Sequence, residues 1–376
     1  MIALQAWMRQ DLSVTSAVSL VLPGTLILRG PPSGTLSIGL LVPLSGVMGI
    51  AGPSILNFAL LAAEHVAERV GKVPELVVID AGRGPDEVAA LVGQLVSAGL
   101  VHGLVGAHTS DVRAAVARVV ADRVPYVFTP PRERDSMRSG TIFTGSDPRM
   151  QLQRPLEWII AHHRVRRWAL IGNEYVWPRQ VHRVASKVLR DLGQSVVMDR
   201  LVPLGSVDTE RLLDEAGKSR AEAILLSLVG RDGINFHRQA TEAGTGQRFI
   251  RLYTTFDENC LLAAGGDETG LLYSAMPSFI GQQDERHERL MELYRDRFGV
   301  SAPLPASYAE GCYDGIMLLA ELQLSGLLGS MPPPVAARRV AAAGSLGGAA
   351  YAGSAVRSQL AVAEGHELLV IGNSAA

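Results

Sequence analysis

Apolar and polar positions alternate regularly along the chain from about residue 35 onward. The first apolar run, LSIGLLVPL at residues 36–44, is short and almost continuous, as expected of a strand buried on both faces. Residues 53–72 follow with helical spacing, and their apolar stripe is formed by Ile55, Phe58, Ala62, Val66 and Val70. The same alternation predicts strands at 75–80, 103–108 and 124–130 and helices at 85–98 and 110–120.

A second run of the same kind begins near Asp147. It predicts helices at 153–162, 181–192, 209–216 and 233–243 and strands at 166–172, 195–204, 221–230, 249–255 and 271–279. Two more helices are predicted at 284–298 and 306–323, before the break at Pro332–Pro334. The tail ends in two strand-like runs, 355–364 and 366–372, which predict a hairpin. The sequence therefore predicts two α/β units, each with a parallel sheet covered on both faces.

Composition and charge are those of a folded chain. The protein has 376 residues, of which 47% are hydrophobic and 19% charged, with a formal net charge of −2. A chain of this length predicts two domains, and a balance this close to neutral argues against a direct nucleic-acid partner or an acidic membrane. Cys260 and Cys312 have no metal-binding spacing. We expect two buried free thiols, with a single optional disulfide as the alternative.

The first 34 residues allow two interpretations. Leu12 to Leu28 is uncharged and fairly apolar, but Pro23 and Gly24 interrupt it and it is short for a membrane-spanning helix. The positive start of a secretory signal is missing, no convincing cleavage site follows, and no cysteine is available for a lipid anchor. We expect a cytoplasmic protein whose residues 1–34 are a poorly ordered or targeting extension. An exported protein, at the cell surface or in the periplasm, is the alternative.

Ligands of open parallel sheets bind outside the carboxyl ends of the strands, so the loops at those ends are the candidate site. These loops are rich in hydroxyl groups, from Ser45, Thr109, Ser110, Thr129, Tyr175, Thr254 and Thr255. Tyr175 and Trp177 stand together in GNEYVWPRQ, although only 5% of the chain is aromatic. Structural roles compete with binding at several positions: Ser110 is a suitable helix cap, Thr129 a turn residue, and Trp177 a hydrophobic staple.

Six motifs carry a family resemblance, in this order: PLSGVMGIAGP, GAHTSDVRAAV, VPYVFTP, GNEYVWPRQ, TTFDENCLLA and YAEGCYDGIMLLA. Together they resemble the type I periplasmic-binding-protein fold. Within it they resemble the branch of the amide sensor of bacterial aliphatic amidase operons and the short-chain amide and urea receptors of transporters. The likeness runs from about Ser37 to Gly329. The Y-x-W-P-R element at Tyr175–Arg179 is its most specific part.

The resemblance implies an α/β fold of two doubly wound parallel-sheet lobes that close on a ligand like a Venus flytrap. Three crossovers would join the lobes, near Ser146–Arg149, near Phe279–Gln282 and at the Pro-rich break. Lobe one would then comprise 35–146 plus 281–330, and lobe two 147–280 plus 331–376.

The resemblance also implies binding residues in the loops of both lobes. With Ser45 from the hydroxyl-rich loops, the expected ligand-binding set is Ser45, His108, Thr109, Ser110, Phe128, Thr129, Tyr175, Val229, Thr254 and Thr255. His108 stands where the amide sensor has tyrosine, and the loop FTPPRE is one residue shorter. A neutral amide suits such a site, because hydroxyl and backbone groups satisfy it without a buried charge.

We therefore expect a non-catalytic sensor of small neutral amides that controls amide- or nitrile-degrading enzymes through a partner regulator or a homo-oligomer. The alternative is the substrate-binding receptor of an ABC importer for amides, urea or branched-chain amino acids. We expect no cofactor and no metal, no direct contact with nucleic acid, and no membrane contact unless the protein is exported. The common catalytic motifs are missing, namely Walker A, G-x-G-x-x-G, G-x-S-x-G and H-E-x-x-H, so no enzyme is predicted.

Overall fold

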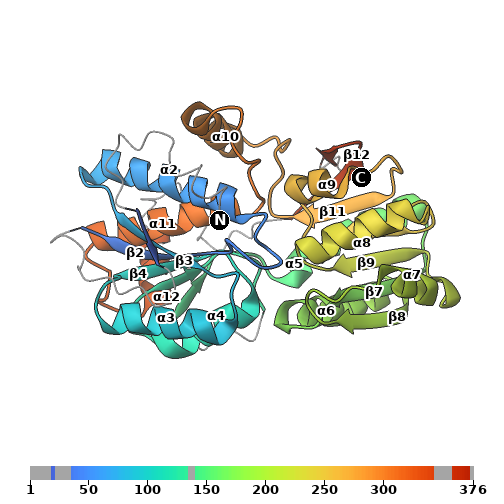
Figure 1. The fold of residues 1–376 in the computed structure, drawn as a ribbon, viewed down its shortest axis with the longest axis horizontal. Coiled ribbons are helices and arrows are strands. Elements are labelled where there is room, and N and C mark those ends of the chain that lie inside the picture. Colours follow the sequence, from blue (N-terminus) through green and yellow to red (C-terminus); the bar gives the residue numbers. More distant parts are fainter. Residues whose placement is uncertain (1–17, 22–34, 134–139, 343–357, 373–376) are drawn as a thin grey trace.

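The structure is a computed structural model that describes residues 18–21, 35–133, 140–342 and 358–372 (Figure 1). Within these residues the chain forms two α/β lobes, each built on one sheet. Apart from the C-terminal hairpin, the strands that the sequence predicts pair in parallel within two sheets, because strands buried on both faces need helices on both sides. The predicted α/β fold class, with two lobes each built on a mainly parallel sheet, is confirmed.

The sheet of lobe one has the order β1-β3-β2-β4-β5-β6 among the described residues, and every neighbouring pair is parallel. Its strands are β1 (Val18–Val21), β2 (Ser37–Val42), β3 (Glu75–Asp80), β4 (Gly103–Gly106), β5 (Tyr126–Phe128) and β6 (Thr141–Phe143). One face packs on α2 (Gly52–Val70), α11 (Ala309–Leu324) and α12 (Pro333–Ala342), and α10 (Glu285–Phe298) packs on α2. The other face packs on α3 (Pro85–Ser97) and α4 (Ser110–Val120).

The sheet of lobe two has the order β13-β12-β11-β10-β9-β7-β8. Its strands are β7 (Arg167–Asn173), β8 (Ser195–Val202), β9 (Ala223–Ser227), β10 (Ile250–Tyr253), β11 (Leu272–Met276), β12 (Gln359–Glu364) and β13 (Glu367–Val370). One face packs on α5 (Pro148–His163) and α6 (Val176–Asp191). The other packs on α7 (Thr209–Lys218), α8 (Arg231–Glu242) and α9 (Glu258–Ala264).

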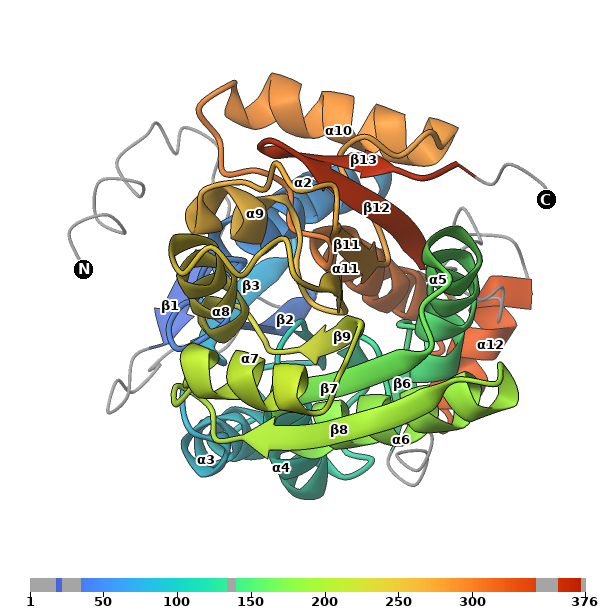
Figure 2. The same cartoon turned by 90° about the vertical axis from the view of Figure 1, so that its right-hand side faces the viewer.

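The C-terminal hairpin is present, and it completes the sheet of lobe two. β12 pairs antiparallel with β13 on one side and with β11 on the other, which places the tail beside a strand more than eighty positions earlier in sequence (Figure 2). The other strand pairs of this sheet are parallel. A short connection suffices for the antiparallel pair, whereas the parallel pairs need helical crossovers.

The third crossover lies later in the chain than we expected. Instead of breaking the chain into lobe two, Pro332–Pro334 opens helix α12, which packs on α11 and β6 in lobe one. Ala336, Ala337 and Val340 are buried in the lobe-one core. Proline is well tolerated in the first turn of a helix, where its missing N–H costs nothing. Residues 333–342 therefore belong to lobe one, and only β12 and β13 of the described tail lie in lobe two.

Three further elements had no counterpart in the expected pattern. Strand β6 and helix α9 are only three and seven residues long, too short for a periodicity to be read. Val18–Val21, inside the N-terminal extension, pairs in parallel with β3 at the sheet edge, and the rest of residues 1–34 lies outside the described residues. None of the helices in the described ranges is both long and apolar enough to cross a membrane.

Candidate functional site

The carboxyl ends of both sheets face each other where the two lobes meet. We call this boundary the lobe interface: residues 43–51, 107–111 and 129–133 of lobe one, with 173–176, 228–231 and 254–257 of lobe two. The lobes touch here, because the Arg231 backbone N–H donates to the Val47 carbonyl over 2.8 Å. Met48 and Ile50 of lobe one pack against the core cluster of lobe two. Helices α4 and α6 also contact each other across the boundary.

Tyr175 lies in lobe two and faces lobe one. It directly precedes α6 and is half-buried. Burial raises the pKa of its hydroxyl well above the usual 10, and so do the nearby Asp111, Tyr308 and Glu133, all of which belong to lobe one. The hydroxyl therefore stays protonated and can donate. It forms no hydrogen bond with any residue that the structure describes.

Helix α4 presents a second group of donors to the same interface. Thr109 is the residue before the helix, and its side chain makes no capping hydrogen bond. Ser110 is the first residue of α4, and its side chain is buried without a hydrogen bond to another described residue. We expected Ser110 as a possible cap, but the capping position belongs to Thr109. Ser45, in the loop after β2, is exposed, and within the described ranges its hydroxyl has no partner either.

The three other threonine hydroxyls of the expected set already donate to the backbone. Thr129 donates to the Gly106 carbonyl over 3.2 Å. Thr254 and Thr255 donate to the carbonyls of Leu226 and Leu228 over 3.3 and 2.7 Å. These hydrogen bonds hold the strand ends together, and each hydroxyl oxygen keeps capacity only as an acceptor.

His108 and Phe128 are enclosed in lobe one. Both are almost fully buried, and their rings meet edge to face at 5.4 Å. The Tyr126 hydroxyl donates to Nε2 of His108 over 2.9 Å, and Nδ1 donates to the Thr109 carbonyl over 3.0 Å. Burial lowers the pKa of His108 to about 4, so the imidazole is neutral near pH 7. With both ring nitrogens bonded inside the lobe, His108 supports the Thr109 loop from behind.

Val229 is positioned by the buried side-chain amide of Asn173. The Val229 N–H donates to Oδ1 of Asn173 over 2.9 Å, and Nδ2 of Asn173 donates to Asp232 over 2.7 Å. Val229 itself is buried and belongs to none of the four core clusters of the described residues. The Asn173 side chain thereby ties the end of β7 to the loop that leads into α8. Trp177, in contrast, is buried in the core between α5 and α6, as the staple interpretation predicts.

Four helices begin at the lobe interface without a side-chain cap. They are α2, α4, α6 and α8, which start after Ala51, Thr109, Tyr175 and Gly230. In contrast, the aspartates that precede α5, α7, α9 and α10 each accept backbone N–H groups. Uncapped helix starts leave N–H donors for another partner, and their positive dipole ends favour a ligand's acceptor atoms.

A buried ion pair that no sequence motif revealed borders the same region. Arg113 of α4 and Glu133 form a salt bridge of 3.0 Å, and both side chains are less than 10% exposed. The Arg113 guanidinium lies over the rings of Phe128 and Phe143, 5.6 Å from each centroid. Since Arg113 is already paired, it is not a spare cation for a ligand. Because Glu133 is paired with Arg113, the negative character of the interface near Tyr175 comes from Asp111.

A serine–histidine–aspartate row lies nearby, under α6. The Ser227 hydroxyl donates to Nε2 of His182 over 3.0 Å, and Nδ1 of His182 donates to Asp199 over 2.6 Å. Such a row can activate a serine nucleophile. Here Ser227 is completely buried and is covered by Gly172, where an added Cβ would lie 2.2 Å from the serine oxygen. The row therefore has no room for a substrate and joins α6 to the sheet.

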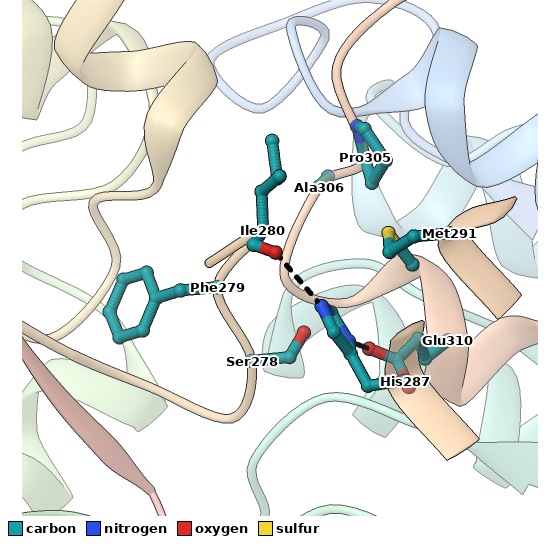
Figure 3. A pocket seen from close by; sticks show the side chains of 8 residues that line it. All are labelled: Ser278, Phe279, Ile280, His287, Met291, Pro305, Ala306 and Glu310. Atoms are coloured by element: carbon teal, nitrogen blue, oxygen red, sulfur yellow. Dashed lines mark hydrogen bonds and ion pairs between the residues drawn. The ribbon is translucent and has the colours of Figure 1, made fainter. Parts of the chain in front are cut away.

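The second crossover is clamped from both lobes. Glu258 of α9 accepts the Ile280 N–H over 2.7 Å. Nε2 of His287 donates to the Ile280 carbonyl over 3.3 Å, as Figure 3 shows. His287 also pairs with Glu310 at 2.6 Å. Burial acts to lower the pKa of His287, but the hydrogen bond and charge of Glu310 outweigh it and the pKa is raised. A cavity of only about 10 Å³ lies here, which has no space for a ligand larger than a water molecule.

Metal binding has no support at these positions. Within the described ranges, no group of three or more His, Cys, Asp or Glu side chains is arranged to hold a metal ion. Cys260 and Cys312 are both free and buried, as the sequence predicts. Burial raises the pKa of both thiols, so neither is a reactive thiolate.

Comparisons with solved structures show the same two-lobed fold in substrate-binding proteins of transporters. A fatty acid ABC transporter substrate-binding protein from Thermomonospora curvata matches with a TM-score of 0.75 and 16% identity, covering 91% of this chain and 92% of that one. The branched-chain amino acid transporter substrate-binding protein LivJ from Streptococcus pneumoniae, solved with isoleucine, matches with a TM-score of 0.74 and 16% identity, covering 90% and 99%.

A third match is an ABC transporter solute-binding protein from R. palustris in complex with 4-hydroxybenzoate. Its TM-score is 0.73 at 16% identity, and the match covers 90% of this chain and 95% of that one. Identities this low establish the fold alone. The sequence itself goes further, because the profile of the family described as "Periplasmic binding protein" matches residues 35–325. This chain is therefore a member of the periplasmic binding protein family.

Proposed function

We propose that this protein is the substrate-binding receptor of an ABC importer and that it binds a small polar ligand between its lobes. The observation that carries the proposal is that hydrogen-bond donors without a partner among the described residues lie on both sides of the lobe interface. The unbonded Tyr175 hydroxyl of lobe two lies near Asp111, in the first turn of the uncapped helix α4, which begins at Ser110 in lobe one. A ligand that accepts from both sides would join the lobes.

The importer interpretation replaces the sensor as the main one. All three solved relatives described above are substrate-binding proteins of transporters. A transport receptor works outside the cytoplasm, so this interpretation also favours the exported alternative over a cytoplasmic protein. The amide sensor with a partner regulator remains the competing proposal, and the family membership suits both.

The charges near Tyr175 narrow the chemical class of the ligand. Donors from Tyr175, Ser110 and the α4 backbone call for an acceptor such as a carbonyl or carboxylate oxygen. Asp111 lies close enough to raise the pKa of Tyr175, so it favours a ligand that also carries N–H donors or an ammonium group. Amides, urea and branched-chain amino acids have both features. A plain carboxylate such as benzoate has only the first.

Ligand size sets how tightly each class can bind. An amide of about four heavy atoms gains at most about 6 kcal/mol, at about 1.5 kcal/mol per atom, so its Kd cannot fall much below tens of micromolar. An amino acid of about nine heavy atoms can bind far more tightly. If the ligand is present at micromolar concentration, an amino acid is therefore the better candidate. A small amide is a good candidate only if it is present at millimolar concentration.

Thermal unfolding of the purified protein tests the binding proposal. The panel is isobutyramide, propionamide, urea, leucine, isoleucine and benzoate, each at about 10 mM; at about 100 times Kd a ligand stabilises by about 2.7 kcal/mol, which raises Tm by several degrees. A shift with amides or amino acids and none with benzoate supports the proposed ligand class. No shift with any compound contradicts it.

A secretion-reporter fusion to residues 1–40 separates the importer from the sensor. The importer predicts export of the reporter, and export contradicts a cytoplasmic sensor.

A further inference from the structure

The loop Val47–Ile50, which we call the latch loop, reaches from lobe one onto lobe two (Figure 1). Its Val47 carbonyl accepts the Arg231 N–H at the start of α8 over 2.8 Å. The side chains of Met48 and Ile50 are half-buried against the core cluster of lobe two. All of these contacts would be lost if the lobes separated, and none of them needs a ligand.

The base of the latch loop is fixed firmly to lobe one. Oδ1 of Asp80 accepts the backbone N–H groups of Leu44, Ser45 and Gly82 over 2.9, 3.1 and 2.9 Å. Gly82 packs so closely that an added Cβ would lie 2.0 Å from the Ser45 carbonyl oxygen. A loop held in this way moves with its lobe, so its tip is already ordered before it meets lobe two.

The surface that receives the latch loop depends on one glycine. Gly230 has φ 48° and ψ −118°, and a Cβ there would lie 2.0 Å from the Val47 carbonyl oxygen. A positive φ already favours glycine here, although Ala121 adopts a similar conformation, φ 46° and ψ −133°, in the same protein. The close approach of the other lobe is a second reason for glycine at this position.

We propose that the latch loop and Gly230 form a ligand-independent latch that holds the lobes together, with Gly230 as its positioning residue. The inference builds on the proposed function, since closure matters only if a ligand binds between the lobes. A latched protein keeps its binding groups assembled, so a ligand spends less of its binding energy on closing the lobes. Weakening the latch should accelerate ligand release more than it slows association.

The test measures lobe separation without any ligand. Spin labels are attached at Lys72→Cys in lobe one and Arg190→Cys in lobe two, both of which are exposed, while the two native cysteines are buried. The wild-type background should give one dominant short distance. Met48→Asp with Ile50→Asp should shift the distribution to longer distances, with the ratio of closed to open molecules falling at least about tenfold.

Two controls keep the result specific. Val300→Asp places one such carboxylate at a valine that is 94% exposed, and it should leave the distances unchanged. Gly230→Ala should open the lobes, while Ala121→Gly measures what alanine costs in this backbone conformation away from the interface. Unchanged distances in the Met48/Ile50 variant would overturn the latch. If no compound of the ligand panel raises Tm but the Met48/Ile50 variant still shows longer label distances, the proposed ligand class is refuted and the latch is supported.

Discussion

Tyr175→Phe removes one oxygen atom and separates a binding role from a structural one. The Tyr175 hydroxyl has no hydrogen-bond partner among the described residues, and burial with the nearby Asp111, Tyr308 and Glu133 raises its pKa and keeps it protonated. Its loss should therefore leave the free energy of unfolding within about 0.5 kcal/mol of wild type. If the hydroxyl donates to the ligand, its removal costs about 0.5–1.5 kcal/mol of binding, which weakens affinity about two- to twelvefold.

A matched tyrosine gives the opposite expectation. Tyr126→Phe removes a buried hydroxyl that donates to His108, so unfolding free energy should fall by about 1 kcal/mol. Ligand affinity should change little, since Tyr126 lies in the lobe-one core. The assay is urea unfolding of both variants without ligand, followed by calorimetric titration with the compound that gives the largest thermal shift.

The reasoning about Tyr175 fails in either of two ways. Wild-type affinity in Tyr175→Phe would show that the hydroxyl does not reach the ligand. A loss of stability in the ligand-free variant as large as that of Tyr126→Phe would show that the hydroxyl has a partner within the protein.

Three further predictions concern residues outside the proposed ligand site. Arg251→Met should destabilise the protein by roughly 3–5 kcal/mol in urea unfolding, because it leaves the buried Asp267 carboxylate without its 2.9 Å partner; a loss below about 1 kcal/mol would contradict this. Burial raises the pKa of the Glu258 carboxyl group from 4.5 to about 7, so the folded protein binds the carboxyl proton more tightly than the unfolded chain does. The stability that this proton contributes is present below about pH 4.5 and is lost as the pH rises through 7. Glu258→Gln should therefore gain stability relative to wild type between about pH 5 and about pH 8, and a constant difference would refute the assignment. Gly315→Ala should cost roughly 1–3 kcal/mol by overpacking, since the added Cβ would lie 2.8 Å from Val105, and an unchanged urea midpoint would contradict that contact.

The sequence predicts most of the fold because the lobes are built from strong local patterns. The strand predicted at 75–80, with its apolar centre Leu76–Ile79, matches β3 residue for residue, and the helix at 110–120 matches α4 in the same way. The exceptions have physical causes. The Pro332–Pro334 run is typical of a chain break, yet it opens α12, because proline fits a first helical turn and the helix then buries alanines in lobe one.

The candidate site was harder to predict, because the orientation of a side chain cannot be read from a loop sequence. His108 and Thr129 occupy the predicted loops, but their polar groups bond within lobe one. The Arg113–Glu133 pair has no sequence signal, since it joins a helix to a loop twenty residues away. Tyr175 was the most informative position, because an aromatic residue directly before a helix has no obvious structural use there.

The measurement that tests the central claim most directly is a calorimetric titration of the purified protein with isobutyramide, urea and isoleucine. The account predicts one saturable site per chain for at least one of them, with Kd no lower than about tens of micromolar for urea, which has about four heavy atoms, and with room for tighter binding of the larger isobutyramide and isoleucine, and with no ammonia released. An absence of binding heat with all three compounds, or steady hydrolysis of the amide, would contradict the claim that this is a receptor for a small polar ligand.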